Sequence, residues 1–410
     1  MFASAGPIVP PNYNSAMAVD ICIRGAGVVG KSLALLLARA RVRVGLVASS
    51  APLPVGTPAD IRAFALNAAS RQLLQSLRAW PDAACAVQRM QVWGEASAPD
   101  HQPATAAHNA SAVQFDAQAL GCEALTWIVP ASALEQQLDA ALRFAPDIQL
   151  LTAAEPAALT VLCEGKHSTT RDAVGVQFTQ TAYGQTAIAA TLRTQQPHQA
   201  TARQWMRGSD FDGEVCALLP LHSSPDSGNF IALVWSVSHD RAHQLLALDD
   251  AQFCAQLQHA CGNALGTMQL SSPRAAWPLH MAQASRWVGT GLPGAPQAAW
   301  ALAGDAAHVV HPLAGQGLNL GLADVAALAH TLVAKEYFRS YGDMRLLRRY
   351  ERARHADAAA LRLATDGLQR LFAMPDARVR GLRNWGMRQF DTLQPIKSMV
   401  MRKAMGLGAL

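Results

Sequence analysis

Residues 304–324 read GDAAHVVHPLAGQGLNLGLAD, and this stretch carries most of the information about the fold. The apolar run directly before it ends abruptly at Gly304, as a β-strand does when it meets a sharp turn. An apolar segment of helical character follows over residues 318–333. Between strand and helix, Gly315 and Gly317 let the backbone approach a ligand closely and turn its N–H groups toward it. A helix N-terminus adds partial positive charge there, so the stretch predicts a site for a ring that becomes anionic on reduction.

A second glycine-rich turn lies close to the N-terminus. Apolar strands are expected over residues 19–24 and 42–47, with an apolar helix between them. The first strand runs into a GxGxxG pattern formed by Gly25, Gly27 and Gly30. Strand, GxGxxG, helix and strand in this order make up the dinucleotide-binding unit, in which a helix N-terminus faces a diphosphate.

Taken together, the two stretches resemble those of the class A flavoprotein monooxygenases. The HPLAGQGLNLGLAD segment is similar to the branch of that family that hydroxylates ubiquinone precursors. The similarity runs over nearly the whole chain, from about Asp20 to Gly406. It implies an α/β fold with a Rossmann-like FAD-binding domain, an interleaved antiparallel-sheet substrate domain and C-terminal helices, the class A flavoprotein hydroxylase fold. It also implies FAD as cofactor and NADPH or NADH as reductant, without a second Rossmann unit.

The resemblance also assigns roles to individual residues. In the family, the residue matching Asp305 binds the ribityl chain, and the loop matching 312–319 lies against the isoalloxazine ring. Arg62 is expected near the flavin and the diphosphate, with an exposed helix charge as the alternative. On this basis the expected cofactor-binding residues are Gly25, Gly27, Gly30, Arg62, Glu164, Gly304, Asp305, Pro312, Gly315, Gln316, Gly317, Leu318 and Asn319.

Three positions depart from the family pattern. Ala48 stands where the second strand should end in an acidic residue that binds the adenosine ribose. Ser132 replaces the arginine of an Asn-Arg pair, and Glu164 replaces the aspartate of an Asp-Gly motif. A lost acid beside several arginines also fits a ligand with a 2′-phosphate, but the stretch at Gly304 belongs with FAD.

The length and composition fit a protein of two or three domains. The chain has 410 residues, of which 50% are hydrophobic and 15% charged, and no apolar run reaches the length of a membrane-spanning helix. The expected organisation is a disordered leader at 1–18, an FAD-binding domain formed by 19–80, 120–176 and 288–340, a substrate-binding β-sheet domain formed by 81–119 and 177–287, and a basic C-terminal helical region at 341–410.

Cysteine and histidine usage argues against a metal site. The seven cysteines form no Cys-x-x-Cys pair, which predicts reduced thiols and a cytoplasmic protein. His308 and His311 have no nearby thiols to complete a metal site. They are the weak candidates for acid–base catalysis near the flavin, and the alternative is a histidine that stabilises the loop.

The charge distribution is uneven along the chain. Residues 345–410 contain 14 Lys or Arg and 5 Asp or Glu, although the whole chain carries a net charge of only +5. No nucleic-acid-binding motif accompanies this basic segment. Its basic residues alternate with apolar ones at helical spacing, which favours peripheral contact with the inner face of a membrane. A solvated helical face above a packed apolar one remains the alternative.

The function implied by the resemblance is hydroxylation of an aromatic ring by O2. The substrate would be a (poly)prenylated phenol or quinol intermediate of ubiquinone biosynthesis, and the reaction would use reduced flavin and its C4a-hydroperoxide. Association with a ubiquinone-biosynthesis complex is also expected.

Two alternatives remain open. Ala48, Ser132 and Glu164 are compatible with a degenerate protein that binds a quinone intermediate or acts as an accessory factor without turnover. The enzyme could also hydroxylate an unrelated small aromatic compound.

Overall fold

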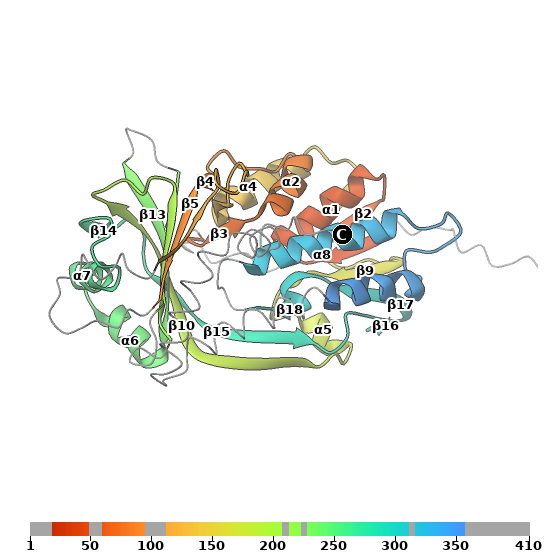
Figure 1. Ribbon diagram of the computed structural model, residues 1–410. Helices are drawn as coiled ribbons and strands as arrows, with labels where there is room; N and C mark the ends of the chain where they lie inside the picture. The colour runs from red at the N-terminus through yellow and green to blue at the C-terminus, as the bar shows by residue number, and fades with distance from the viewer. Residues whose placement is uncertain are drawn as a thin grey trace, which may run out of the picture.

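The computed structural model describes residues 19–48, 60–94, 112–206, 213–222, 228–310 and 316–356. In these residues the chain forms a six-stranded sheet, a nine-stranded sheet and a small three-stranded sheet. Figure 1 shows the nine-stranded sheet edge-on beside the body that contains the six-stranded sheet and its helices. The arrangement confirms the expected α/β class with a separate sheet that is antiparallel except for one parallel strand pair. The expected domain boundaries stay a prediction, and the expected leader at 1–18 lies outside the described residues.

The six-stranded sheet has the order β16-β17-β9-β1-β2-β8. All neighbours pair in parallel except β16 and β17, which form an antiparallel pair. Its strands are nearly continuous apolar runs because helices cover both faces of such a sheet. The strands are β1 (Ile21–Arg24), β2 (Val44–Val47), β8 (Ile148–Leu151), β9 (Leu159–Leu162), β16 (Val288–Leu292) and β17 (Ala295–Leu302). The helices that pack with this sheet or with each other are α1 (Val28–Arg39), α4 (Ala131–Leu142) and α8 (Gln316–Val333).

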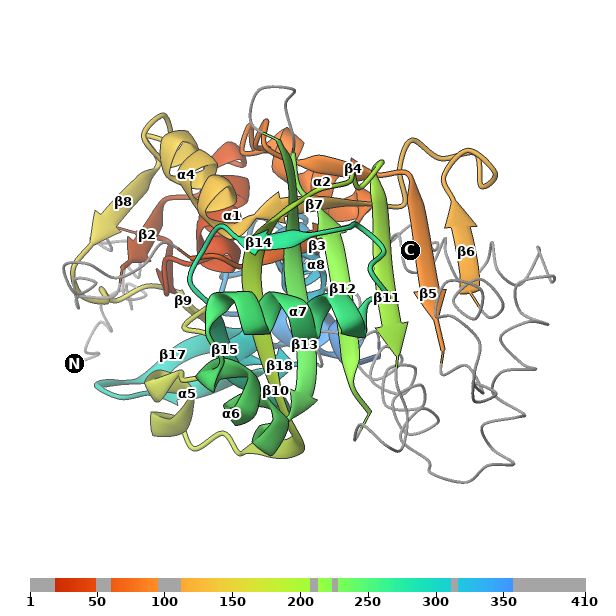
Figure 2. The ribbon, with the colours of Figure 1, turned by 90° about the vertical axis from the view of Figure 1, so that its left-hand side faces the viewer.

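The nine-stranded sheet follows the path β18-β15-β10-β13-β12-β11-β5-β6, and β14 pairs with β10 off this path. Ile188, Ala190 and Leu192 point to one face, where they join a core with the helices α6 and α7. Figure 2 shows both helices lying across that face. The elements are β5 (Arg89–Trp93), β6 (Ala112–Asp116), β10 (Phe178–Thr194), β11 (Thr201–Met206), β12 (Val215–Pro220), β13 (Asn229–Ser238), β14 (Met268–Leu270), β15 (Ala275–Ala284), β18 (His308–Val309), α6 (His239–Ala247) and α7 (Asp250–Ala260).

The small sheet has the order β3-β7-β4. Its side chains extend two separate cores, one with α1, α2 and α4 and one with residues of β5, β11 and β12. The elements are β3 (Ala63–Leu66), β4 (Cys85–Val87), β7 (Thr126–Pro130) and α2 (Ala68–Ser76), while the short helix α5 (Thr169–Ala173) follows β9.

The C-terminal region is described only in its first part. Residues 344–356 are helical, which agrees with the expected helices, and residues 357–410 lie outside the described part of the chain. Among the helices that the structure describes, none has the length and apolar character needed to cross a membrane. All seven cysteines are free thiols.

Candidate cofactor and substrate site

A cavity of about 1890 Å³ extends from the carboxyl ends of the parallel strands to the inner face of the nine-stranded sheet. Arg24, Val47 and Ala303 lie at or just beyond the ends of β1, β2 and β17 and line it. Ligands of open α/β sheets bind at this edge. The volume exceeds the roughly 300–1,000 Å³ of an ordinary small-molecule site, so it has room for a cofactor and a second molecule.

Glycine is required in the turn between β1 and α1. A Cβ atom at Gly25 would lie 2.4 Å from the carbonyl oxygen of Cys163, and one at Gly30 would lie 1.9 Å from the carbonyl oxygen of Gly25. A Cβ atom at Gly27 would meet nothing within 4 Å, because this residue borders the cavity. Gly27 is also the N-cap of α1. Because it has no side chain, it leaves the N–H groups of the first turn without a side-chain cap. The backbone N–H groups of that turn therefore fit the diphosphate of a dinucleotide.

Glu164 is held by a network just after β9. Its carboxylate accepts hydrogen bonds from Arg24 Nε at 2.8 Å, Ser168 Oγ at 2.6 Å and Thr170 Oγ1 at 2.9 Å. Arg24 and Glu164 both line the cavity. The longer side chain of Glu164 thus joins the ends of β1 and β9 and orders the turn into α5. Its expected contact with the cofactor stays a prediction.

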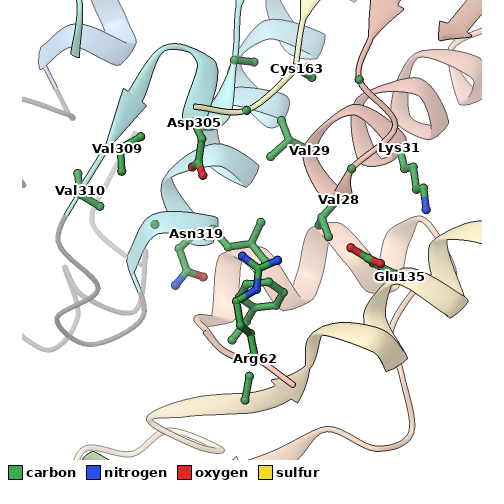
Figure 3. A pocket seen from close by; sticks show the side chains of 18 of the residues that line it. Val28, Val29, Lys31, Arg62, Glu135, Cys163, Asp305, Val309, Val310 and Asn319 are labelled. Atoms are coloured by element: carbon green, nitrogen blue, oxygen red, sulfur yellow. The ribbon is translucent and has the colours of Figure 1, made fainter. Parts of the chain in front are cut away.

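Arg62 lies directly before β3 and borders the cavity. Its guanidinium binds the Asp60 carboxylate, with 2.6 Å between Nη2 and Oδ2. The hydrogen bonds that Arg62 donates to Asp60 raise the pKa of Arg62, and the negative charge of Asp305 acts in the same direction. Arg62 thus leads into a strand and does not lie on a helix, as the alternative for this residue supposed. Figure 3 shows Arg62 extending toward the space below Asp305 and Asn319.

Asp305 lies on the short 3₁₀ turn Gly304–Ala306 after β17 and borders the cavity. Desolvation by the surrounding protein raises the pKa of the Asp305 carboxyl. The positive charges of His308, Arg62 and Lys166 lower it, but they offset only part of that rise. Among the described residues, no side chain donates a hydrogen bond to this carboxylate at bonding distance. A carboxylate that faces a deep cavity in this way fits a ligand with several hydroxyl groups, such as a ribityl chain.

A buried carboxylate holds the turn that carries Asp305. Asp324 on α8 is fully buried and accepts hydrogen bonds from Gly304 N at 2.9 Å, His308 Nε2 at 2.6 Å and Arg354 Nε at 2.7 Å. Burial raises the pKa of Asp324, but His308 and Arg354 together outweigh it and hold the pKa below its usual value. Asp324 belongs to the quoted stretch, but the sequence alone gave no sign of its supporting role.

His308 is buried and does not border the cavity within the described part of the chain. Its ring lies 4.9 Å from that of Trp287, and its Nε2 is committed to Asp324. This environment favours the loop-stabilising alternative over acid–base catalysis, which stays a prediction for this residue. His311 lies outside the described residues.

Hydrogen bonds of Asn319 connect the start of α8 to β3 and to the start of α2. Asn319 Nδ2 donates to the carbonyl oxygen of Ala65 at 2.8 Å. Its Oδ1 accepts from Asn67 N at 2.9 Å and from Ser70 Oγ at 2.7 Å. Asn319 also borders the cavity, together with Gly317 and Leu318. Pro312, Gly315 and the side chain of Gln316 are not described, so their expected flavin contacts stay predictions.

The far wall of the cavity lies on the sheet that was expected to bind the substrate, but its individual residues were not identified from the sequence. One row of paired residues crosses four strands there, Ala189 opposite Val234, Val234 opposite Ala217, and Ala217 opposite Gln204. Ser236 and Trp277 border the same space. The wall is mainly apolar, and small side chains leave room for a flat ring. The alternating polarity of these strands was visible in the sequence, but the pairing that aligns them was not.

Comparison with known proteins agrees with this site. A family model described as an FAD binding domain matches residues 152–364. A ubiquinone hydroxylase of Rhodospirillum rubrum is 32% identical over 94% of this chain and 89% of its own length. The 3-demethoxyubiquinol 3-hydroxylase of Escherichia coli is 31% identical over 95% of this chain and 98% of its own.

Solved structures share the fold. A probable FAD-dependent monooxygenase from Pseudomonas aeruginosa superposes with a TM-score of 0.67 at 18% identity, covering 90% of this chain and 99% of that one. The p-nitrophenol 4-monooxygenase of Pseudomonas putida superposes with a TM-score of 0.68 at 17% identity, covering 94% and 96%. The sequence matches and the cavity together lead to one conclusion. The chain belongs to the class A FAD-dependent aromatic monooxygenases, in the family of the ubiquinone-biosynthesis hydroxylases.

Proposed function

We propose that the protein hydroxylates the aromatic ring of a (poly)prenylated phenol or quinol intermediate of ubiquinone biosynthesis. The observation that carries this proposal is a continuous cavity that joins the glycine-rich turn to the apolar wall of the nine-stranded sheet. The names of the full-length relatives support the class of substrate. One oxygen atom of O2 enters the ring and the other leaves as water, with two electrons from NADPH or NADH.

The residues at the glycine-rich end would hold FAD. The N–H groups at the start of α1 would bind the diphosphate, and the Asp305 carboxylate would accept hydrogen bonds from the ribityl hydroxyls. Gly317 and Leu318 at the start of α8 would lie beside the ring, near the positive end of the helix. Bound FAD supplies the reduced ring that activates O2. The protein's own contribution is to place the ring, exclude water and stabilise negative charge on it.

The wall of small residues would hold the substrate ring. Ala189 and Ala217 leave space against the sheet, while Ser236 and Gln204 place polar groups beside it. Ring hydroxyls can therefore be oriented by a few hydrogen bonds in an otherwise apolar pocket. Near the small sheet the cavity is also lined by apolar side chains that would accept a hydrocarbon tail, namely Ala65, Met90, Leu125, Ile128, Ala202 and Leu219.

The test begins with an absorption spectrum of the purified protein, before and after addition of FAD. Bound oxidised flavin, followed by NAD(P)H-dependent addition of one oxygen atom to a prenylated phenol, is the expected result. Failure to bind flavin at a large excess of FAD would favour the non-catalytic alternative, for which the absence of a carboxylate at Ala48 is the supporting observation. Equal turnover of simple phenols would favour the unrelated aromatic substrate.

We also propose peripheral contact of the basic C-terminal region, 341–410, with an anionic membrane surface at the inner face, within a ubiquinone-biosynthesis complex. Support comes from the segment just before it, where Tyr337 and Phe338 are 95% and 68% exposed. Aromatic and basic side chains side by side are typical of membrane-surface segments. Co-sedimentation with anionic vesicles that weakens with added salt, and no binding to zwitterionic vesicles, is the expected result.

A further inference from the structure

An ion pair is built into the wall of the cavity between α1 and α4. Lys31 is the fourth residue of α1 and directly follows Gly30. Its Nζ lies 2.6 Å from Oδ1 of Asp139 on α4, and both residues border the cavity. The Lys31 side chain is 11% exposed and that of Asp139 is 53% exposed. Figure 3 shows Lys31 beside the start of α1, with Glu135 of α4 near Val28.

Packing alone gives no reason for charges at this contact. The helices α1 and α4 already share an apolar core through Leu35, Leu134 and Leu138. Removing an ammonium group from water costs free energy that one ion pair seldom recovers, and an apolar side chain of similar volume would serve packing at least as well. A cation in the first turn of α1 does, however, add to the positive potential where a diphosphate would bind.

The pair shares a helix with one altered cofactor position and the cavity wall with another. Ser132, at the start of α4, replaces the family's arginine, and Ala48, just beyond β2, replaces its acid. On α4, Ser132 and Asp139 are seven residues apart, which places them on the same face of the helix. Ala48 and Asp139 border the same cavity. The chain therefore lacks one cation and one carboxylate at the family positions and has one of each on the cavity wall.

We propose that Lys31 and Asp139 form this chain's own subsite for the ADP half of FAD. The ammonium of Lys31 supplies the charge that Ser132 lacks and contacts the diphosphate. The carboxylate of Asp139 positions that ammonium and accepts a ribose hydroxyl, which Ala48 cannot do. This inference rests on the assignment of FAD to the cavity.

The test compares ligands that contain and lack the ADP half. FAD, ADP and riboflavin are titrated into the flavin-free full-length protein, as wild type, K31M and D139N, by calorimetry and flavin fluorescence. K31M keeps the aliphatic stem and removes only the charge. We expect both variants to raise the Kd of FAD and of ADP by about tenfold to a hundredfold, since each loses a charge-assisted hydrogen bond. The Kd of riboflavin should stay unchanged.

A matched control is D250N, which breaks the ion pair between Asp250 on α7 and Arg274, away from the cavity. It should leave all three dissociation constants unchanged. Unchanged FAD and ADP binding in K31M and D139N would overturn the inference, as would an equal loss of FAD and riboflavin accompanied by a lower melting temperature. Wild-type protein that binds none of the three ligands would instead overturn the assignment of FAD to this cavity.

Discussion

At its glycine-rich end the cavity is shaped by backbone turns, whereas at its sheet end it is shaped by side chains on paired strands. In the first region a Cβ atom at Gly30 would collide with the backbone of Gly25, so the geometry tolerates one residue type. In the second region Ala217 lies between Gln204 and Val234 on neighbouring strands, and many residue types would fit the strand itself. The difference teaches that cofactor geometry is encoded locally, while the shape of the substrate pocket depends on register. Substitutions at the two ends should therefore differ in what they change.

The largest effect is expected at the buried support of the cofactor end. D324N keeps the size of the side chain but leaves Arg354 buried without its carboxylate partner. Loss of one member of a buried pair costs about 3–5 kcal/mol, so chemical denaturation should show a fall of that size in the free energy of unfolding. D250N, at a pair whose carboxylate is exposed, should change it by about 1 kcal/mol or less. Equal effects of the two substitutions would contradict a special role for Asp324.

The lowered pKa of Asp324 predicts that the free energy of unfolding falls at acidic pH. The pKa of Asp324 is lower in the folded than in the unfolded protein, where it is about 3.9. Its contribution is therefore fully present above that value and is lost as the pH falls through the lower, folded value. Unfolding measured from pH 6 down to pH 2 (roughly the range in which such a carboxyl titrates) should show a steeper loss in the wild type than in D324N. Parallel curves would assign the acid sensitivity to other groups.

Alanine substitutions at two glycines of the same turn should have different effects on stability. G30A would bring its Cβ atom to 1.9 Å from the carbonyl oxygen of Gly25, so the backbone must shift. We expect a loss of about 3 kcal/mol in the free energy of unfolding and no bound flavin. G27A meets no protein atom within 4 Å. Its apoprotein should melt as the wild type does, while FAD binding weakens. A stable G30A protein that binds FAD would refute the close-packing argument.

At the sheet end, A217F should impair use of the substrate without changing FAD binding or stability. The larger side chain would fill the pocket next to Val234 and Gln204 without touching the glycine-rich turn. We expect FAD affinity and melting temperature to remain as in the wild type and kcat/KM for the prenylated phenol to fall about a hundredfold. T181F, on an exposed part of β10, serves as the control. Loss of flavin from A217F would show that the two regions are not independent.

The smallest effect is a gain at the adenosine position. A48D restores a carboxylate at the end of β2, next to the cavity. One added hydrogen bond to the ribose should lower the Kd of FAD by about tenfold or less, as measured by flavin fluorescence. The gain should be larger in a D139N background if Asp139 already takes part of this role. Weaker binding in A48D would show that the ribose lies elsewhere.

The sequence was sufficient where chemistry depends on neighbours in the chain. The pattern of Gly25, Gly27 and Gly30 predicted a dinucleotide turn, and the structure places Asp305 on the turn after β17 as expected. Arg62 and Glu164 were predicted to bind the cofactor, and both line the cavity, while their contact with the cofactor stays a prediction. Their ion pairs with Asp60 and Arg24 were not predicted, because a one-letter pattern says nothing about the direction of a side chain.

Local patterns therefore predicted the dinucleotide-binding turn, since a strand followed by a glycine turn and a helix is stable only in a few backbone arrangements. The fold class and FAD followed from the family that the two glycine-rich stretches resemble. Contacts between distant parts of the chain decided the rest. Arg24 and Glu164 are 140 residues apart, and Asn319 reaches Ala65 across 254 residues. The pocket wall likewise exists only when β10, β13, β12 and β11 pair in one register, and a shift of one residue would turn every side chain of the row to the other face.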